Sequence, residues 1–412
     1  MASVIPFKAA RPVREYVKEV ASYPYDVIDS REARHIAKGN SKSFLHVIKS
    51  EIDLPEHIDP YDDKVYAKAR ENLKCFLDKG ILFQDEEPCF YVYRQKVGDH
   101  EQYGIAGCVS VADYESGHIK KHELTREDKE TDRTRHMDII NAQPGPILMT
   151  YRAEKAIDDV VKRVVKGEPE YDFVSDDGIS HAVWVISDRS EIKIIEDAFL
   201  KIESIYIADG HHRTASAARV AEKRRKENPD HKGNEEYNYM LAVLFPDNQV
   251  KIMDYNRAVT NLGGMTEEEF LDKLSEKFSI TGGFEDRSPR EPHVFGMYLK
   301  GRWYKVSAKE GTFDNSDVVD ILDVSILQRN LLSSVLGIGD IRTDKRITFI
   351  GGIRGMDELE RLVNSGDYAV AFSLFPTTVR QLMDVADAAK VMPPKSTWFE
   401  PKLRSGIFVH LF

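Results

Sequence analysis

The run Asp209-Gly210-His211-His212-Arg213 gathers four chemically capable side chains around one glycine. A carboxylate can hold a cation or orient a hydroxyl, imidazoles carry protons near neutral pH, and a guanidinium binds phosphate through two donors. The preceding residues 204–208 form an apolar run typical of a buried strand, and the alanine-rich residues 214–222 favour a helix. The sequence therefore predicts a strand-to-helix turn that carries these groups.

Such a turn favours an anion, and phosphate above all. Gly210 permits a tight turn, and the start of the next helix presents backbone N–H groups and the positive end of its dipole. We therefore assign phosphate or nucleotide binding to Gly210, His211, His212, Arg213 and Thr214. The alternative is a structural Asp-Gly turn. Adjacent histidines also point in different directions, so one ligand need not meet both.

Composition limits the class of protein. The 412 residues are enough for two or three domains, and the 42% hydrophobic and 10% aromatic fractions fit a globular protein. The net charge of −11 argues against a general nucleic-acid or membrane surface. Cys75, Cys89 and Cys108 are widely spaced, which fits a reducing compartment. With neither a signal-peptide core nor a long apolar run, we expect a cytoplasmic protein.

The remaining pattern alternates strands with helices. We expect a hairpin formed by 90–94 and 103–111, and another at 294–306 about Lys300-Gly301. Further strands are expected at 43–48, 171–174, 181–186, 239–246 and 251–259. Helices are expected at 66–79, 126–138, 153–165, 191–200 and 266–278, with Thr266 capping the last. The pattern predicts an α/β (α+β) fold with a mixed sheet.

A second set of polar residues stands far from the central motif in sequence. Glu123 follows a short strand and directly precedes the charged helix expected at 126–138, a place where catalytic carboxylates often lie. Six other residues have side chains that could border an anion but are expected to be solvated: Lys8, Arg11, Tyr25, Asp26, Arg133 and Arg135. The segment Lys395-Ser396-Thr397 carries anion-binding side chains beside Trp398 and Phe399, so we expect it to pack near the turn.

Several segments together resemble one family over nearly the full length, the family known as domain of unknown function 1015. The resemblance rests on residues 5–7, 24–27, 43–47, 122–123, 132–133, 208–213 and 392–397. The family name states no activity. The Asp-Gly-His-His-Arg run also resembles that of the free serine kinases, which are built on the ParB/sulfiredoxin-like fold.

That second resemblance implies a fold, a division of the chain and an activity. The catalytic core would be a ParB/sulfiredoxin-like unit at 119–262, between N-terminal (1–118) and C-terminal (263–412) α/β regions. Free serine kinases move a phosphoryl group from ADP or ATP to the hydroxyl of free serine. By resemblance, Glu123 would be the general base, and the catalytic set would include Asp209, His211 and His212. Asp209 would also hold Mg²⁺, and Lys395, Ser396 and Thr397 would add phosphate contacts.

Three functional hypotheses follow from these residues. The first is a nucleotide-dependent kinase that converts a small hydroxy compound, free L-serine foremost, into its phosphate ester. The second is a nucleotide-binding regulatory protein of the ParB-like superfamily, and the third is a hydrolase using the same site on water. No Gly-x-x-x-x-Gly-Lys-Ser/Thr loop is present, which excludes a P-loop enzyme. The expected partners are a nucleotide and a small molecule, without membrane or nucleic acid; a homodimer remains open.

Overall fold

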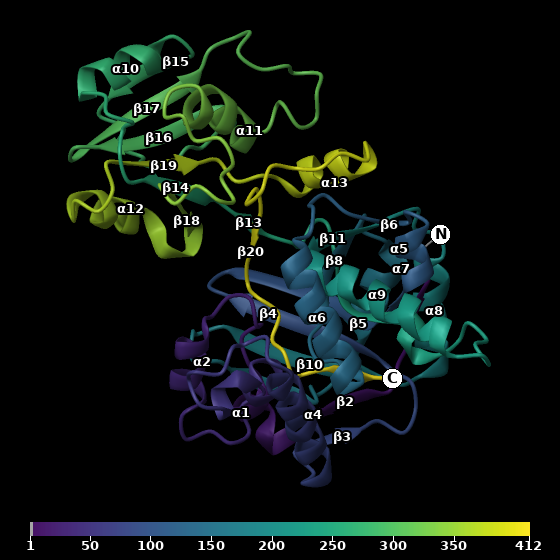
Figure 1. Cartoon of the computed structure of the whole chain (residues 1–412). Helices are drawn as coiled ribbons and strands as arrows, with labels where there is room; N and C mark the ends of the chain where they lie inside the picture. Colours follow the sequence, from purple (N-terminus) through teal and green to yellow (C-terminus); the bar gives the residue numbers. More distant parts are fainter. Residues whose placement is uncertain (1–2) are drawn as a thin grey trace. The chain divides into compact units, whose positions relative to one another are not determined.

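The computed structural model describes residues 3–412, and their contacts divide the chain into two units (Figure 1). The first comprises the residues up to Lys121, Thr125–Val250 and Pro401–Phe412; the second comprises His122–Leu124 and Lys251–Glu400. This division differs from the three ranges expected from sequence. Ranges 1–118 and 119–262 both supply strands to one sheet, because strand pairing joins residues far apart in the chain.

A nine-stranded mixed sheet forms the centre of the first unit. Its order is β6 (Ile119–Lys120), β11 (Ile205–Asp209), β8 (Ile147–Tyr151), β12 (Tyr239–Pro246), β5 (His100–Ser110), β4 (Phe90–Val97), β10 (Ser180–Ile186) and β9 (Tyr171–Val174), with β1 (Val4–Ile5) paired to β5. The pairs β6–β11 and β8–β12 are parallel, and the others are antiparallel. The predicted mixed sheet and the β4–β5 hairpin are therefore confirmed.

Helices bury apolar faces against this sheet. The main core cluster joins inward residues of β4, β5, β8, β10, β11 and β12 to α7 (Lys155–Val164), α8 (Arg189–Phe199) and α9 (His211–Glu227). Helix α6 (Glu127–Ile140) packs against α9. Further helices are α1 (Val17–Val20), α2 (Ser30–Ala37), α3 (Leu45–Ile48), α4 (Asp63–Asp78) and α5 (Val111–Glu115). A smaller sheet has the order β3 (Leu82–Gln84), β2 (Ala9–Pro12), β21 (Val409–Leu411), β7 (Ala142–Gln143).

Two expectations for the N-terminal part of the chain are wrong. Residues 43–48 were expected to form a strand, but α3 covers Leu45–Ile48 within a core cluster built with α2 and α4. A four-residue apolar run has no period that separates strand from helix, so its tertiary neighbours decide. Arg11, expected to be solvated, is buried between Asp85 and Glu170, with 2.8 Å to each carboxylate.

The second unit has its own antiparallel sheet. Its order is β15 (Phe278–Gly282), β17 (Arg302–Ala308), β16 (Val294–Leu299), β19 (Val370–Leu374), β14 (Tyr255–Val259) and β18 (Ile347–Gly351). The other elements are α10 (Glu267–Ser275), α11 (Asp323–Leu327), α12 (Gly355–Asn364), α13 (Val379–Asp387), and the pair β13 (Ile252–Met253) and β20 (Trp398–Phe399). The β16–β17 hairpin and the Thr266 cap are confirmed. Among described helices, none has both the length and the apolar character needed to cross a bilayer.

Two buried histidines in the first unit stay neutral. His136 donates through Nε2 to the Val47 carbonyl at 3.0 Å, and His181 Nδ1 lies 2.8 Å from the Tyr93 hydroxyl. Burial lowers the pKa of each to about 3, helped by the charge of a nearby arginine. Between pH 6.5 and 3 the unfolded chain therefore binds a proton at each position that the native protein does not, so stability falls as pH falls.

We predict that the free energy of unfolding decreases on acidification from pH 6 to pH 4, with each of these histidines contributing about 1.4 kcal/mol per pH unit. His136→Gln keeps a donor for Val47 and should remove one such contribution, as measured by urea unfolding at several pH values. The exposed His57→Gln is the control and should leave the slope unchanged. An unaltered slope in His136→Gln would show that His136 is protonated in the native state.

Candidate active site at a strand-to-helix turn

The predicted strand-to-helix turn is present. Strand β11 ends at Asp209, α9 begins at His211, and Gly210 between them adopts φ 101° and ψ 29° in the left-handed region. The Thr214 N–H donates to the Gly210 carbonyl at 2.9 Å and the Thr214 hydroxyl donates to it at 3.2 Å, which closes the first turn. Gly210 has no side chain with which to cap α9. The first backbone N–H groups of the helix therefore have no partner from the cap residue.

Glycine is required at position 210 for a second reason. A Cβ atom there would lie 2.9 Å from Arg213 Nε and 3.1 Å from the guanidinium carbon. The Arg213 side chain therefore folds back across the turn and packs against the Gly210 backbone. Its guanidinium donates to the Pro146 carbonyl at 2.6 Å and lies 3.5 Å from the Asp209 carboxylate.

Asp209 stands between two cations. Lys402 Nζ and Arg213 Nη2 lie 3.6 Å and 3.5 Å from the same carboxylate oxygen. Burial alone would raise the pKa of Asp209, but Lys402, Arg213 and His211 lower it to about 2. The Asp209 side chain remains 31% exposed, so an ionised oxygen is accessible at the turn. Sequence reasoning missed Lys402, because nothing local marks one lysine in the C-terminal segment as a partner of Asp209.

Arg213 extends inward to a small cavity of about 20 Å³, whose polar lining includes Tyr25, Arg133 and Ser405. Arg133 was expected to be solvated; its guanidinium instead lies 4.3 Å from the centre of the Tyr25 ring and pairs with Asp132 at 2.7 Å. Asp26 and Asp209 raise the pKa of Arg213 against the effect of burial. The cavity is about the size of one water molecule. Arg213 therefore supports the turn from the interior.

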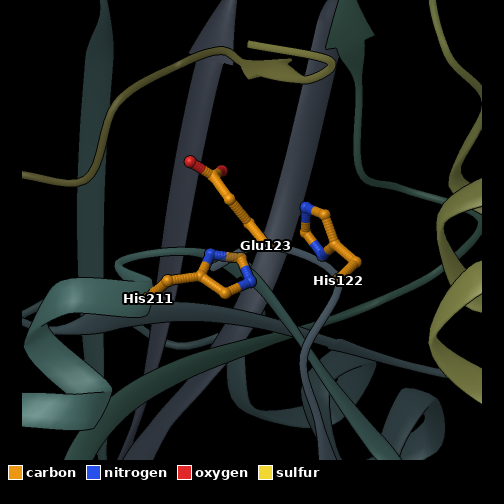
Figure 2. A group of neighbouring side chains, drawn as sticks. All are labelled: His122, Glu123 and His211. Carbon is orange, nitrogen blue, oxygen red and sulfur yellow. The ribbon is translucent and has the colours of Figure 1, made fainter. Parts of the chain in front are cut away.

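The two adjacent histidines separate, as their positions on a helix require. His212 is half-buried, and its Nε2 accepts the Arg126 backbone N–H at 3.0 Å. Burial lowers the pKa of His212, which keeps the ring neutral and suited to accept this bond. His211 is buried; Figure 2 draws its side chain together with those of His122 and Glu123, which group with the second unit.

Two contacts within the first unit flank Glu123 in the sequence. In the parallel pair β6–β11, Ile119 is opposite Ile205 and Lys120 is opposite Tyr206. Beyond Glu123, the Arg126 backbone N–H donates to His212 at the start of α9. Glu123 itself lies in the segment His122–Leu124, which groups with the second unit, so its approach to the turn stays a prediction.

The C-terminal segment expected near this turn lies in the second unit. The Lys395 carbonyl accepts from Arg257 Nη2 at 2.7 Å, and the Ser396 carbonyl accepts from the Thr377 hydroxyl at 2.9 Å. Ser396 is buried there, and Lys395 adopts φ 60°. These contacts fix the segment within the second unit, and its approach to the turn, including any role of Thr397, stays a prediction.

The fold and the turn define a mixed α/β protein in which a strand-to-helix turn carries Asp209, Gly210 and Arg213. The chain belongs to the family described as "Protein of unknown function (DUF1015)", whose sequence profile matches residues 4–325. No curated protein matches the chain.

Among solved structures, "Free serine kinase in complex with AMP" is similar at 12% identity with a TM-score of 0.36, covering 72% of this chain and 90% of that one. A conserved hypothetical protein from Pyrococcus furiosus gives 12% and 0.35, with 74% and 96% covered. SbnI with a C-terminal truncation, from Staphylococcus aureus, gives 11% and 0.36, with 73% and 85% covered. At these values the similarities assign neither a ligand nor a reaction to this chain.

We predict that Gly210→Ala destabilises the first unit more than a glycine substitution at an open position. The left-handed backbone alone costs about 1–2 kcal/mol for alanine, and the new Cβ must also displace Arg213. Gly39→Ala is the matched control, because Gly39 has φ 81° with nothing near its Cβ position. Urea unfolding measures both, and equal losses would contradict the close approach of Arg213.

We predict that Lys402→Met raises the pKa of Asp209 from about 2 toward the ordinary 3.8. A depressed carboxylate pKa gives stability that is complete above about pH 4 and is lost as pH falls toward 2. The variant should therefore be less stable at neutral pH, and the difference should shrink in acid. NMR titration of ¹³C-labelled aspartate carboxyls measures the pKa. Lys155→Met, at an exposed lysine paired with Asp159, is the control and should leave Asp209 unchanged.

Proposed function

We propose that the protein is a nucleotide-dependent phosphotransferase that moves a phosphoryl group from ATP or ADP to the hydroxyl of a small molecule. The observation that carries the proposal is the turn at Asp209–Gly210, where an ionised, partly exposed carboxylate borders the start of α9, which has no side-chain cap. The resemblance of the Asp-Gly-His-His-Arg run to that of the free serine kinases makes free L-serine the first acceptor to test, with O-phosphoserine as product.

The helix start supplies the phosphate site in this proposal. Backbone N–H groups of His211, His212 and Arg213 would donate to phosphate oxygens, supported by the positive end of the α9 dipole. The buried positive charge of Arg213 lies just beneath this turn and adds to the potential there. The Thr214 hydroxyl donates to the Gly210 carbonyl, so Thr214 contributes by holding the turn in shape.

Asp209 suits the magnesium ion that accompanies a nucleotide. Its carboxylate is ionised at neutral pH and partly exposed, and Mg²⁺ is commonly held by one or two carboxylates together with substrate phosphates. When bound, Mg²⁺ would neutralise charge on the transferred phosphate. Lys402 would compete with the metal for the same oxygen, or would itself contact phosphate when Asp209 turns to the metal.

Glu123 is the proposed general base. It is half-buried, and its carboxylate would have to reach the start of α9 to act on an acceptor hydroxyl held there. The acceptor hydroxyl would lose its proton to the Glu123 carboxylate as its oxygen forms a bond to the terminal phosphorus. The bond from that phosphorus to the nucleotide bridging oxygen would break, leaving ADP from ATP or AMP from ADP. Positioning and charge neutralisation supply most of the rate in such transfers.

We predict that Glu123→Gln keeps nucleotide binding and lowers the rate of phosphoryl transfer by roughly 10²–10⁴-fold, the usual contribution of a general base. The substitution keeps the shape of the side chain and removes its basic oxygen. Nucleotide binding is measured by calorimetry, and transfer is measured from ATP and from ADP, each with and without free serine. Glu127→Gln, at an exposed glutamate in the first turn of α6, is the control and should match the wild type.

The same assay separates the alternative functions. Nucleotide turnover that does not depend on any hydroxy compound would instead support a hydrolase. Binding without turnover, under all acceptors tried, would support a nucleotide-binding regulatory protein. Wild-type transfer in Glu123→Gln would assign proton removal to another group, with His211 and then His212 the next residues to replace.

A further inference from the structure

Arg257, on strand β14 of the second unit, is a buried cation without a counter-ion. The residue is 2% exposed. Its Nη2 donates to the Lys395 carbonyl at 2.7 Å, and its Nη1 donates to the carbonyls of Tyr255 and Asn256. Among residues 3–412, no carboxylate forms an ion pair with this guanidinium. Burying a charge in this way is costly, because carbonyl dipoles replace only part of the hydration that is lost.

Arg257 differs in this respect from the other buried arginines of the described chain. Each of them pairs with a carboxylate; they are Arg11, Arg213 and Arg404. Burial acts on Arg11 and Arg213 as well, but nearby carboxylates raise the pKa of both above the usual value. Burial lowers the pKa of Arg257 to about 10, because no carboxylate opposes the effect. Its guanidinium carbon instead lies 4.6 Å and 5.3 Å from the centres of the Phe349 and Tyr255 rings, which attract a cation but carry no net charge.

A second cation, Lys395, is held beside Arg257 in a strained backbone. Lys395 adopts φ 60°, in the left-handed region where a residue with a Cβ is strained and glycine or asparagine is usual. The Ser396 hydroxyl donates to the Pro393 carbonyl at 2.6 Å and so closes the turn. The Lys395 side chain is exposed, and its Nζ lies 5.9 Å from the centre of the Tyr255 ring. A lysine kept where glycine would be relaxed indicates that its ammonium group has a use beyond the turn.

We propose that Arg257 and Lys395 bind a small oxyanion, a phosphate or carboxylate group, beside the ring of Tyr255. The carbonyls engage at most three of the five N–H donors of Arg257, so donors remain for an anion. The Lys395 ammonium adds three donors on a flexible side chain that reaches solvent. The anion would supply the counter-charge that Arg257 lacks. It would also offset the repulsion between two cations that share one ring.

This proposal does not rest on the phosphotransferase function. Arg257, Lys395 and the rings beside them all belong to the second unit, whereas the turn at Asp209–Arg213 belongs to the first. An anion bound at that turn must therefore be told apart from one bound at Arg257. A signal from the Arg257 side chain itself makes this distinction, so failure of one proposal does not decide the other.

The test follows the side-chain Nε–H signals of the full-length protein labelled with ¹⁵N-arginine, and Arg257→Lys assigns the Arg257 signal by its loss. The protein is titrated with inorganic phosphate and, separately, with acetate. We expect a saturable shift of the Arg257 signal, and the anion that binds more tightly defines the ligand as a phosphate ester or a carboxylate. Sodium chloride at the same ionic strength is the control and should give no saturable shift, because it tests for general screening.

Lys395→Gly separates anion binding from folding. The substitution removes the ammonium group and relaxes the left-handed backbone. We therefore expect the affinity for the anion to fall about fivefold, an effect typical of one opposite charge, while the midpoint of urea unfolding stays the same or rises. Lys300→Gly is the matched control, because Lys300 is also an exposed lysine of the second unit with positive φ, 44°. It should leave the titration of Arg257 unchanged.

Three results would overturn the proposal. The first is a wild-type Arg257 signal that shows no saturable shift with either anion, and the second is an equal shift with chloride. The third is equal affinity in Lys395→Gly and the wild type. Lys395→Met removes the charge without changing the flexibility of the backbone, so it repeats the comparison if the glycine variant is unstable.

Discussion

The parallel pairing of β6 with β11 is the constraint on which the site depends. Only two residue pairs are in register, and beyond them the Arg126 backbone N–H donates to the His212 side chain at the start of α9. A parallel pair needs a crossover connection, so the partners are necessarily distant in sequence. The short strand thereby brings the chain before Glu123 to β11, and the Arg126 hydrogen bond brings the chain after it to the start of α9. The proposed role of Glu123 therefore depends on contacts that the sequence around it does not encode.

The turn itself balances charge against burial. Arg213 is placed beneath the turn because Gly210 lacks a Cβ, and it shares the Asp209 carboxylate with Lys402. This arrangement keeps Asp209 ionised and leaves an exposed oxygen beside the helix start. The two cations already stabilise the negative charge of this carboxylate. A metal ion, free or bound to phosphate, could therefore replace one of them without changing the ionisation of Asp209. The negative charge of Asp209 also offsets the cost of burying the Arg213 guanidinium.

The elements that sequence predicted correctly are those with a strong period or a specific turn. The β4–β5 and β16–β17 hairpins and the Thr266 cap follow from alternation, glycine positions and capping chemistry, all of which are local. The strand expected at 43–48 was wrong because a short apolar run fits a strand or a helix until its neighbours are known. The two structural units differ from the three domain ranges expected from sequence, because one sheet is built from strands spread over the first 250 residues.

For the site, the sequence by itself determined the local turn: a strand, a glycine that must take a left-handed conformation, and a helix whose start favours an anion. Those properties belong to adjacent residues and need no distant partner. Only the tertiary structure decided that Lys402 accompanies Asp209, that Arg133 lines an interior cavity, and that His212 accepts a hydrogen bond from the Arg126 backbone. Each of those facts depends on strand register and on packing across long stretches of chain, which no local pattern encodes.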